Sequence, residues 1–323
     1  METIPPMRDA IQLLQGARHI FAASHIDPDG DAVGSLLGFA ATLRRLGKKV
    51  TVALADPVPW RFEDLIGASD VRAEGPTPQH DVLVSLDASE LARLGAILPR
   101  EVIGGRPLLM IDHHVTNSQF GTVNVLDPVA AATAEIVYFL SLTLGVVPDQ
   151  PTATALLTGI VTDTLGFRTT STTPRTLEVA QALMQSGADL ASIAQRAFNS
   201  QSFAGLQLTA EALAAMHMDD GILWTELTQA TLRRLGIAPG EHAGIVSLLN
   251  SVKEAHIAVV FREKDDGRID VSMRSKPGIS LAPVAAALGG GGHPQAAGTT
   301  LPPPISAARA TVLAALRPLL ATP

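Results

Sequence analysis

The sequence predicts an α/β protein with two domains: a parallel-sheet N-terminal domain with helices on both faces, and a smaller mixed α/β C-terminal domain. Short apolar runs of strand length alternate with segments of helical period in the N-terminal part, as in proteins with a parallel sheet. The chain has 323 residues, which is enough for two hydrophobic cores. Beyond a polar, small-residue stretch at 199–205, the pattern changes to a strand, a helix and a hairpin.

In the N-terminal part, the first strand is predicted at 19–24 (HIFAAS), directly before an acidic loop. The following segment, DAVGSLLGFAATLRRLG, has apolar residues at helical spacing and Gly47 where a helix would end. Further strands are predicted at 48–56, 80–87 and 106–114, and helices at 130–145, 151–167 and, as one continuous segment, 172–198.

For the domains we predict the ranges 1–195 for the first, 196–212 for a linker and 213–323 for the second. The second domain should contain a strand at 221–227, a helix at 230–236 and a hairpin over 256–275 that turns at 265–267. A helix then leads into four consecutive glycines, and a last helix follows a Pro-rich turn.

Composition narrows the possible partners and compartments. The net charge of −7, from 24 basic and 31 acidic residues, gives no broad electrostatic attraction for long nucleic acid. The absence of cysteine excludes disulfides, thiolate metal sites and a thiol nucleophile. Without a signal peptide or a membrane-spanning apolar run, a soluble, cytoplasmic protein with no membrane partner is expected.

Carboxylates and imidazoles follow successive predicted strands. In open α/β sheets, ligands bind beyond the carboxyl ends of the strands, so these side chains should meet at one edge. An EF-hand is excluded, because Ala32 and Gly38 stand where the calcium loop needs glycine and glutamate. Oxygen and imidazole ligands without sulfur suit Mn²⁺ or Mg²⁺, with zinc, iron or cobalt also compatible, and about six ligands suit two ions. The residues are His25, Asp29, Asp31, Asp87, Asp112, His113 and His114, with Asp163 from a helix.

Four of these segments, SHIDPDGDAVGS, VSLDASE, MIDHHVTN and TGIVTDT, resemble in order the motifs of the DHH phosphoesterase superfamily. GGGGHPQAAG resembles the glycine-rich motif of the smaller domain that accompanies it. Size and architecture are most similar to the branch that contains nanoRNases and 3′-phosphoadenosine-5′-phosphate (pAp) phosphatases. This resemblance implies an active site in the cleft between the two domains.

The resemblance also implies roles for individual residues. Two Mn²⁺ ions, replaceable by Mg²⁺ or Co²⁺, would be bridged by Asp87. Asp112 would orient a ligand histidine, and His114 would face the phosphate. The first ion would be held by His25, Asp29 and Asp87, and the second by Asp31, Asp87, His113 and Asp163.

Substrate-binding residues are expected mainly in the second domain. Arg274, with Ser275 beside it, would bind a phosphate, since arginine can donate two parallel hydrogen bonds to one. Backbone amides of the glycine run would approach an anion closely, and His293 would contact a phosphate or a base. Arg168, just past Asp163, is a further candidate. The glycines are Gly290, Gly291 and Gly292.

The predicted function is degradation of very short oligonucleotides (nanoRNA, linear dinucleotides) to mononucleotides, with dephosphorylation of pAp. The alternative is cleavage of cyclic dinucleotides such as cyclic di-AMP. Exonuclease action on long single-stranded DNA ranks lower, because the chain is acidic and only 4% aromatic. Nucleotide binding without turnover ranks last, because every ligand position that the resemblance implies is filled. A homodimer is expected, with the apolar helix at 130–145 as its interface.

Overall fold

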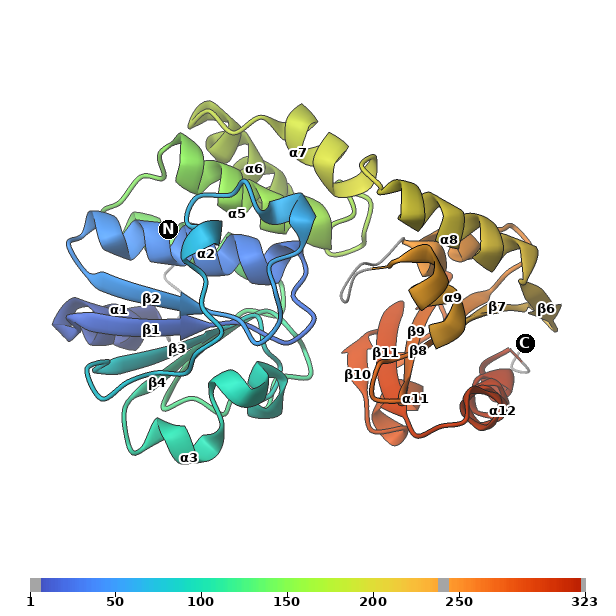
Figure 1. Cartoon of the computed structure of the whole chain (residues 1–323). Coiled ribbons are helices and arrows are strands. Elements are labelled where there is room, and N and C mark those ends of the chain that lie inside the picture. The colour runs from blue at the N-terminus through green and yellow to red at the C-terminus, as the bar shows by residue number, and fades with distance from the viewer. Residues whose placement is uncertain (1–6, 238–243, 321–323) are drawn as a thin grey trace. The chain divides into compact units, whose positions relative to one another are not determined.

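The computed structural model describes residues 7–237 and 244–320, which form two compact units, Met1–Ser200 and Gln201–Pro323. Each unit has its own sheet and core, as the sequence predicts (Figure 1). The expected linker at 196–212 includes the boundary between the units and most of a helix, α8 (Phe203–Ala214). Within the described residues, no helix combines the length and the apolar character needed to cross a bilayer.

The N-terminal unit is built on a sheet whose described strands all run parallel, in the order β2-β1-β3-β4-β5. Since neighbouring strands are parallel, their carboxyl ends reach the same edge of the sheet. Strand β5 was not expected, because four residues at the sheet's edge with a polar Asn124 carry little apolar pattern. The strands are β1 (His19–Ala23), β2 (Lys49–Ala53), β3 (Val82–Leu86), β4 (Leu108–Asp112) and β5 (Val123–Leu126).

Helices cover both faces of this sheet, because successive strand residues point to opposite sides. In β1, Ile20 and Ala22 pack with the long helices, whereas Phe21 and Ala23 pack on the other face against the short helices after β3. Figure 1 shows the two layers above and below the strands. The helices are α1 (Met7–Gly16), α2 (Gly30–Arg45), α3 (Arg100–Ile103), α4 (Thr133–Thr143), α5 (Gln150–Asp163), α6 (Pro174–Gln185) and α7 (Leu190–Phe198), with 3₁₀ turns at Trp60–Phe62, Ala68–Asp70 and Leu91–Ile97.

Two expectations about these helices are wrong. The segment 172–198 is not one helix: α6 ends at Gln185, Gly187 takes a left-handed conformation (φ +98°), and Asp189 caps α7. The segment 130–145 does not offer its apolar side as a dimer interface. Its helix α4 packs against α2 and α5, and most of its apolar side chains are buried within the subunit.

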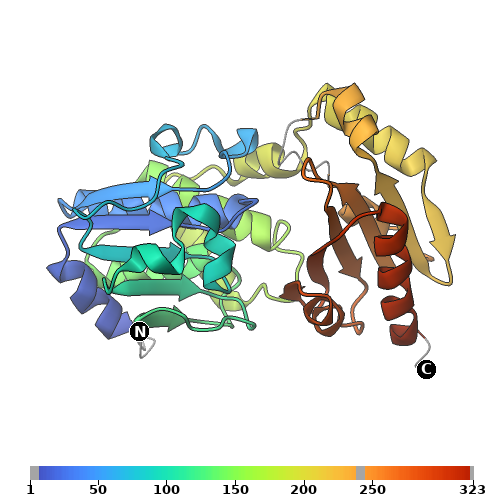
Figure 2. The same ribbon diagram turned by 60° about the horizontal axis from the view of Figure 1, so that its bottom comes forward.

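The C-terminal unit has a mixed sheet, in the order β10-β11-β9-β8-β7-β6 for its described strands. One face packs against α11 and α12, and the other packs against α8, α9 and α10. Figure 2 shows α12, in dark red, lying along the sheet. The strands are β6 (His217–Asp219), β7 (Ile222–Leu227), β8 (Ile257–Glu263), β9 (Ile269–Ser275), β10 (Gly291–His293) and β11 (Ala296–Leu301), and the helices α9 (Gln229–Leu235), α10 (Ile245–Asn250), α11 (Ala282–Ala287) and α12 (Ile305–Leu316), followed by a 3₁₀ turn at Arg317–Leu319.

Candidate active site

The loops after β1 and β3 are tied together at the carboxyl edge of the N-terminal sheet. The Ser24 hydroxyl donates a hydrogen bond to the carbonyl oxygen of Leu86 at 2.8 Å. Asp87, the next residue, has a left-handed backbone (φ +57°), which is uncommon for a residue with a side chain. This turn directs a carboxylate that is 2% exposed toward the neighbouring loops.

Asp87 stands between two histidines from different loops. Its Oδ2 lies 3.5 Å from Nε2 of His25, and its Oδ1 lies 3.7 Å from Nε2 of His113. Nδ1 of His25 donates to the Ile26 carbonyl at 2.7 Å, and Nδ1 of His113 lies 3.2 Å from the Ala130 carbonyl. When the Nδ1–H of each ring donates to its carbonyl, the Nε2 atom carries the lone pair and is available as a metal ligand.

Two groups of potential ligands lie side by side here: Asp87 belongs to the first and lies 3.7 Å from His113 of the second. In each group, one ligand atom per residue can be chosen so that all lie within 4.8 Å of one another. We call the six residues of the two groups together the ligand cluster. The first group is His25, Asp29 and Asp87, and the second is Asp31, His113 and Asp163.

Two of the acidic residues of the cluster, Asp29 and Asp163, lie at the ends of helices. Asp29 caps α2 through its Oδ1, which accepts hydrogen bonds from the amides of Asp31 and Ala32, both at 3.0 Å. Its side chain is 60% exposed. Asp163 is the last residue of α5, and its Oδ2 lies 3.3 Å from Nε2 of His113.

Burial makes this concentration of negative charge costly. It raises the pKa of Asp31 well above its usual value, and the charges of Asp87 and Asp163 add to the effect. Burial likewise raises the pKa of Asp163 to about 7, although His113 acts in the opposite direction. Asp87 differs: burial disfavours its charge, but the hydrogen bond with His25 and the charges of His114, His25 and His113 bring its pKa well below the usual range.

Asp112 holds His114 beside the cluster. Its Oδ1 accepts hydrogen bonds from Nδ1 of His114 at 2.8 Å and from the His113 amide at 2.8 Å, and its Oδ2 accepts one from Asn117 at 2.5 Å. We expected Asp112 to orient a metal-ligating histidine, but the ring it holds is that of His114. Burial lowers the pKa of His114, yet the bond to Asp112 and the carboxylates Asp87 and Asp163 raise it to about 9.

Thr133, which was not among the predicted site residues, contacts two acidic residues of the cluster. Its hydroxyl donates to Oδ1 of Asp87 at 2.9 Å. The amides of Thr133 and Ala134, at the start of α4, donate to Asp31 at 2.6 and 3.0 Å. A threonine at a helix start is common, and only the fold shows that this one faces β3.

In the C-terminal unit, Arg274 and His293 lie on one face of the sheet. Arg274 on β9 and His293 on β10 are both register partners of Ala296 on the intervening strand β11. Register partners on neighbouring strands point to the same face, so the two side chains stand roughly 10 Å apart, two strand spacings, across a small alanine. We call Arg274, Ala296 and His293 the Arg274–His293 face.

The structure does not support Ser275 or Gly290 as substrate contacts. Ser275 is 3% exposed, and its hydroxyl donates to the carbonyl of Ile279 at 2.7 Å. The Gly290 amide already donates to Ala285 at 2.8 Å, and a Cβ there would lie 2.1 Å from the Gly298 carbonyl oxygen, so the lack of a side chain permits close strand packing. At Gly292 a Cβ would lie 2.4 Å from the Ala296 oxygen, whereas Gly291 faces open space.

Arg168 is not a member of the ligand cluster. Its side chain is exposed, and its Nε donates to the carbonyl of Leu165 at 2.6 Å within the same turn. Its contact with a phosphate stays a prediction.

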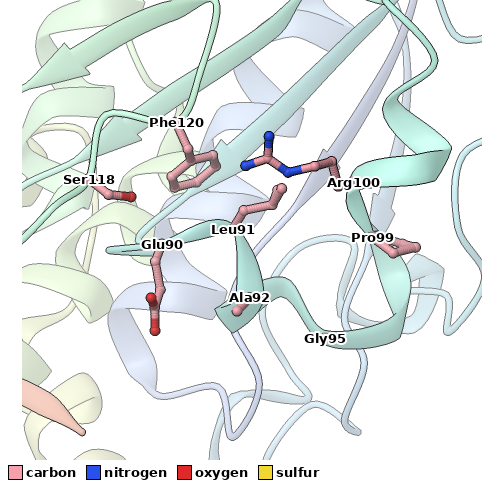
Figure 3. Close-up of a pocket in the computed structure, with 8 residues that line it drawn as sticks. All are labelled: Glu90, Leu91, Ala92, Gly95, Pro99, Arg100, Ser118 and Phe120. Atoms are coloured by element: carbon pink, nitrogen blue, oxygen red, sulfur yellow. The ribbon is translucent and has the colours of Figure 1, made fainter. Parts of the chain in front are cut away.

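A pocket with a volume of about 470 Å³ lies among the loops that follow β3 and β4 (Figure 3). Arg100 and Phe120 both reach into it in Figure 3. None of its lining residues belongs to the ligand cluster. Ser118, which lines the pocket, directly follows Asn117, the residue that donates to Asp112. The lining residues are Glu90, Leu91, Ala92, Gly95, Pro99, Arg100, Ser118 and Phe120.

Each of the two units contains a match to the model of a known protein family. Residues 19–160 match the model of the DHH family N-terminal domain, and residues 225–319 match that of the DHHA1 domain. The chain belongs to the DHH family. The resemblance stated from the motifs is confirmed, and the buried histidines and aspartates of the cluster are consistent with the metal-dependent site of a DHH phosphoesterase.

Individual relatives extend over most of the chain. The bifunctional oligoribonuclease and PAP phosphatase NrnA of Thermus thermophilus is 37% identical over 84% of this chain and 80% of its own length. An exopolyphosphatase-related protein from Bacteroides fragilis has the same fold, with a TM-score of 0.88, 25% identity and 98% of both chains covered. RecJ of Thermus thermophilus in complex with Mn²⁺, at 16% identity, has a TM-score of 0.59 over 97% of this chain and 55% of its own. The last likeness shows the fold alone.

Proposed function

We propose that this protein hydrolyses phosphoric ester bonds in very short oligonucleotides, releasing mononucleotides, and removes a phosphate from pAp. The NrnA relative, whose name states both activities, supports this substrate class. The observation that carries the proposal is the arrangement at Asp87, whose two carboxylate oxygens face the imidazoles of two separate ligand groups.

The residues present fit two divalent cations. His25, Asp29 and Asp87 would hold one, and Asp31, Asp87, His113 and Asp163 the other. Without cations, the carboxylates of Asp31 and Asp163 are driven toward their protonated forms. Two positive ions would offset the repulsion between these carboxylates, as expected at a site that binds cations. Imidazole beside hard carboxylates favours Mn²⁺, with Mg²⁺ and Co²⁺ as substitutes.

The ions, when bound, would lower the pKa of a water molecule and withdraw charge from the phosphate. The chain's own residues would do the rest. His114, with a pKa of about 9, is protonated at neutral pH, and Asp112 fixes its ring through Nδ1. Its other nitrogen, Nε2, is therefore suited to donate a hydrogen bond to a phosphate oxygen or a proton to the leaving oxygen.

The Arg274–His293 face would bind the substrate away from the reacting bond. Arg274 would hold a phosphate, and His293 a second phosphate oxygen or a base edge. Ala296 between them leaves room for a group of that size. A binding surface with few positively charged side chains limits the substrate to a few nucleotides, because tight binding of a long strand needs many phosphate contacts.

A substrate panel tests the proposal. We would follow hydrolysis in Mn²⁺ of a 5′-phosphorylated dinucleotide, pAp, cyclic di-AMP and a 24-nucleotide single strand, each with a parallel reaction in EDTA. We expect fast loss of the dinucleotide and pAp, little change in the long strand, and no reaction in EDTA. Dominant cleavage of cyclic di-AMP or of the long strand would overturn the substrate assignment, and binding without hydrolysis would overturn the activity.

The homodimer stays a prediction, and with α4 buried it has no assigned interface. Light scattering of the eluting protein tests it, with twice the chain mass of 33.7 kDa as the expected result.

A further inference from the structure

One turn supports three residues of the ligand cluster without itself providing a ligand. It spans residues 127–135, from the end of β5 into the first turn of α4, and we call it the supporting turn. Its Ala130 carbonyl faces Nδ1 of His113, its Thr133 hydroxyl donates to Asp87, and the amides of Thr133 and Ala134 donate to Asp31. A shift of this turn would therefore move ligands of both metal groups together.

The far end of the supporting turn is held by a buried carboxylate. Glu135 is fully buried, and its Oε2 accepts hydrogen bonds from the amide of Ala131 at 3.1 Å and the hydroxyl of Thr176 at 3.0 Å. Its Oε1 accepts one from Nε of Arg175 at 2.6 Å. A buried carboxylate is tolerated only with such partners, and losing one leaves a costly unpaired charge.

Arg175 also holds the near end of the turn. Its Nη2 donates to Asp127 at 2.9 Å, so one guanidinium joins Asp127 to Glu135. Asp127 in turn accepts a hydrogen bond from the Val129 amide at 3.1 Å, and its own amide donates to the Asp112 carbonyl at 3.1 Å. The rigid fork of arginine can satisfy both carboxylates at once, which a lysine cannot do.

We propose that Asp127, Glu135 and Arg175 are positioning residues for the metal site: they fix the supporting turn and thereby the spacing of Asp31, Asp87 and His113. Their side-chain hydrogen bonds go to the supporting turn, to Thr176 and to one another, so they act on the ligands through the turn. The proposal rests on the proposed function only in that the cluster binds divalent metal. Outer partners of metal ligands typically change metal affinity by about 10–100-fold when removed.

The test measures Mn²⁺ binding directly, from the electron paramagnetic resonance signal of free Mn²⁺, alongside thermal unfolding in EDTA. Arg175→Met should weaken Mn²⁺ binding by about 10–100-fold, and raised Mn²⁺ should restore most of kcat. The control is Arg44→Met, because Arg44 has nearly the same side-chain exposure (34% against 35%) and pairs with a carboxylate of the same unit, the exposed Asp70, that lies outside the supporting turn. It should lower stability without changing Mn²⁺ affinity.

Should Arg175→Met not fold, Arg175→Lys takes its place, because it keeps the charge but cannot bridge both carboxylates. Thr133→Val against Thr133→Ser then tests the link to Asp87, with weaker Mn²⁺ binding only in the valine variant. Wild-type Mn²⁺ affinity in a folded Arg175 variant would overturn the positioning role. Absence of Mn²⁺ binding by the wild-type protein would instead overturn the proposed metal site.

Discussion

The ligand cluster and the Arg274–His293 face place their residues in opposite ways. The cluster collects side chains from the ends of strands and helices, where the backbone is irregular and Asp87 takes a left-handed conformation. Most of its groups are buried, and the pKa values of Asp31, Asp87 and Asp163 are shifted. The Arg274–His293 face uses only the regular register of three strands, with half-buried side chains. The difference suggests that reacting groups need enforced proximity, whereas binding groups need only regular spacing.

The largest effect should come from Asp87→Asn, because each of the two proposed ions loses a charged oxygen ligand. Turnover in Mn²⁺ should fall by at least about 10³-fold, as when a preorganised charge-stabilising group is removed. The control is Asp56→Asn, since Asp56 also follows a strand of this sheet and accepts a hydrogen bond from the Asp27 amide, but is not a member of the ligand cluster. Near-normal rates for Asp87→Asn would refute the bridging role.

His114→Gln should have the next largest effect, a drop in kcat of about 10²-fold, because a positioned proton donor is lost. The raised pKa of His114 also predicts an alkaline limb in the pH profile of kcat. Because His114 acts protonated and its pKa is about 9, wild-type kcat should fall as pH rises through 9. Rate profiles of the two proteins check this, and an unchanged alkaline limb in His114→Gln would assign that limb to another group.

Arg274→Ala should mainly raise KM, by about 10-fold, if it binds substrate and transition state equally. Ala296→Leu should raise KM similarly by filling the space beside Arg274, although it removes no charge. Arg268→Ala in the neighbouring hairpin turn, where Arg268 pairs with Asp266, is the control and should leave KM unchanged. A loss confined to kcat would instead place Arg274 at the reacting phosphate.

The smallest effect concerns stability without metal. Asp163, with a pKa of about 7, and His114, at about 9, both bind protons more tightly in the folded protein than in the unfolded chain. Stability in EDTA should therefore decrease as pH rises from 5 to 9, by up to about 1.4 kcal/mol per pH unit for each titrating group.

In Mn²⁺ the trend should weaken or reverse, because metal binding competes with these protons. Unfolding temperatures measured at both ends of the range, with and without Mn²⁺, check the prediction. A pH-independent unfolding temperature in EDTA would contradict it.

Sequence reasoning found the cluster because its residues follow apolar strands and form motifs. The Arg274–His293 face was foreseen only as separate residues, since register between β9, β10 and β11 is a tertiary property. Strands β10 and β11 were missed because glycine and alanine carry little strand pattern. Thr133, Glu135 and Arg175 were missed because each acts through a partner distant in sequence, such as Thr133 with Asp87.

The most direct test of the shared role of Asp87 is a crystal structure of the protein with Mn²⁺, with the ions located by anomalous scattering at the manganese absorption edge. We predict two ions per chain, one on each side-chain oxygen of Asp87, with His25 on one and His113 on the other. A single ion, or two ions that do not share Asp87, would contradict the account.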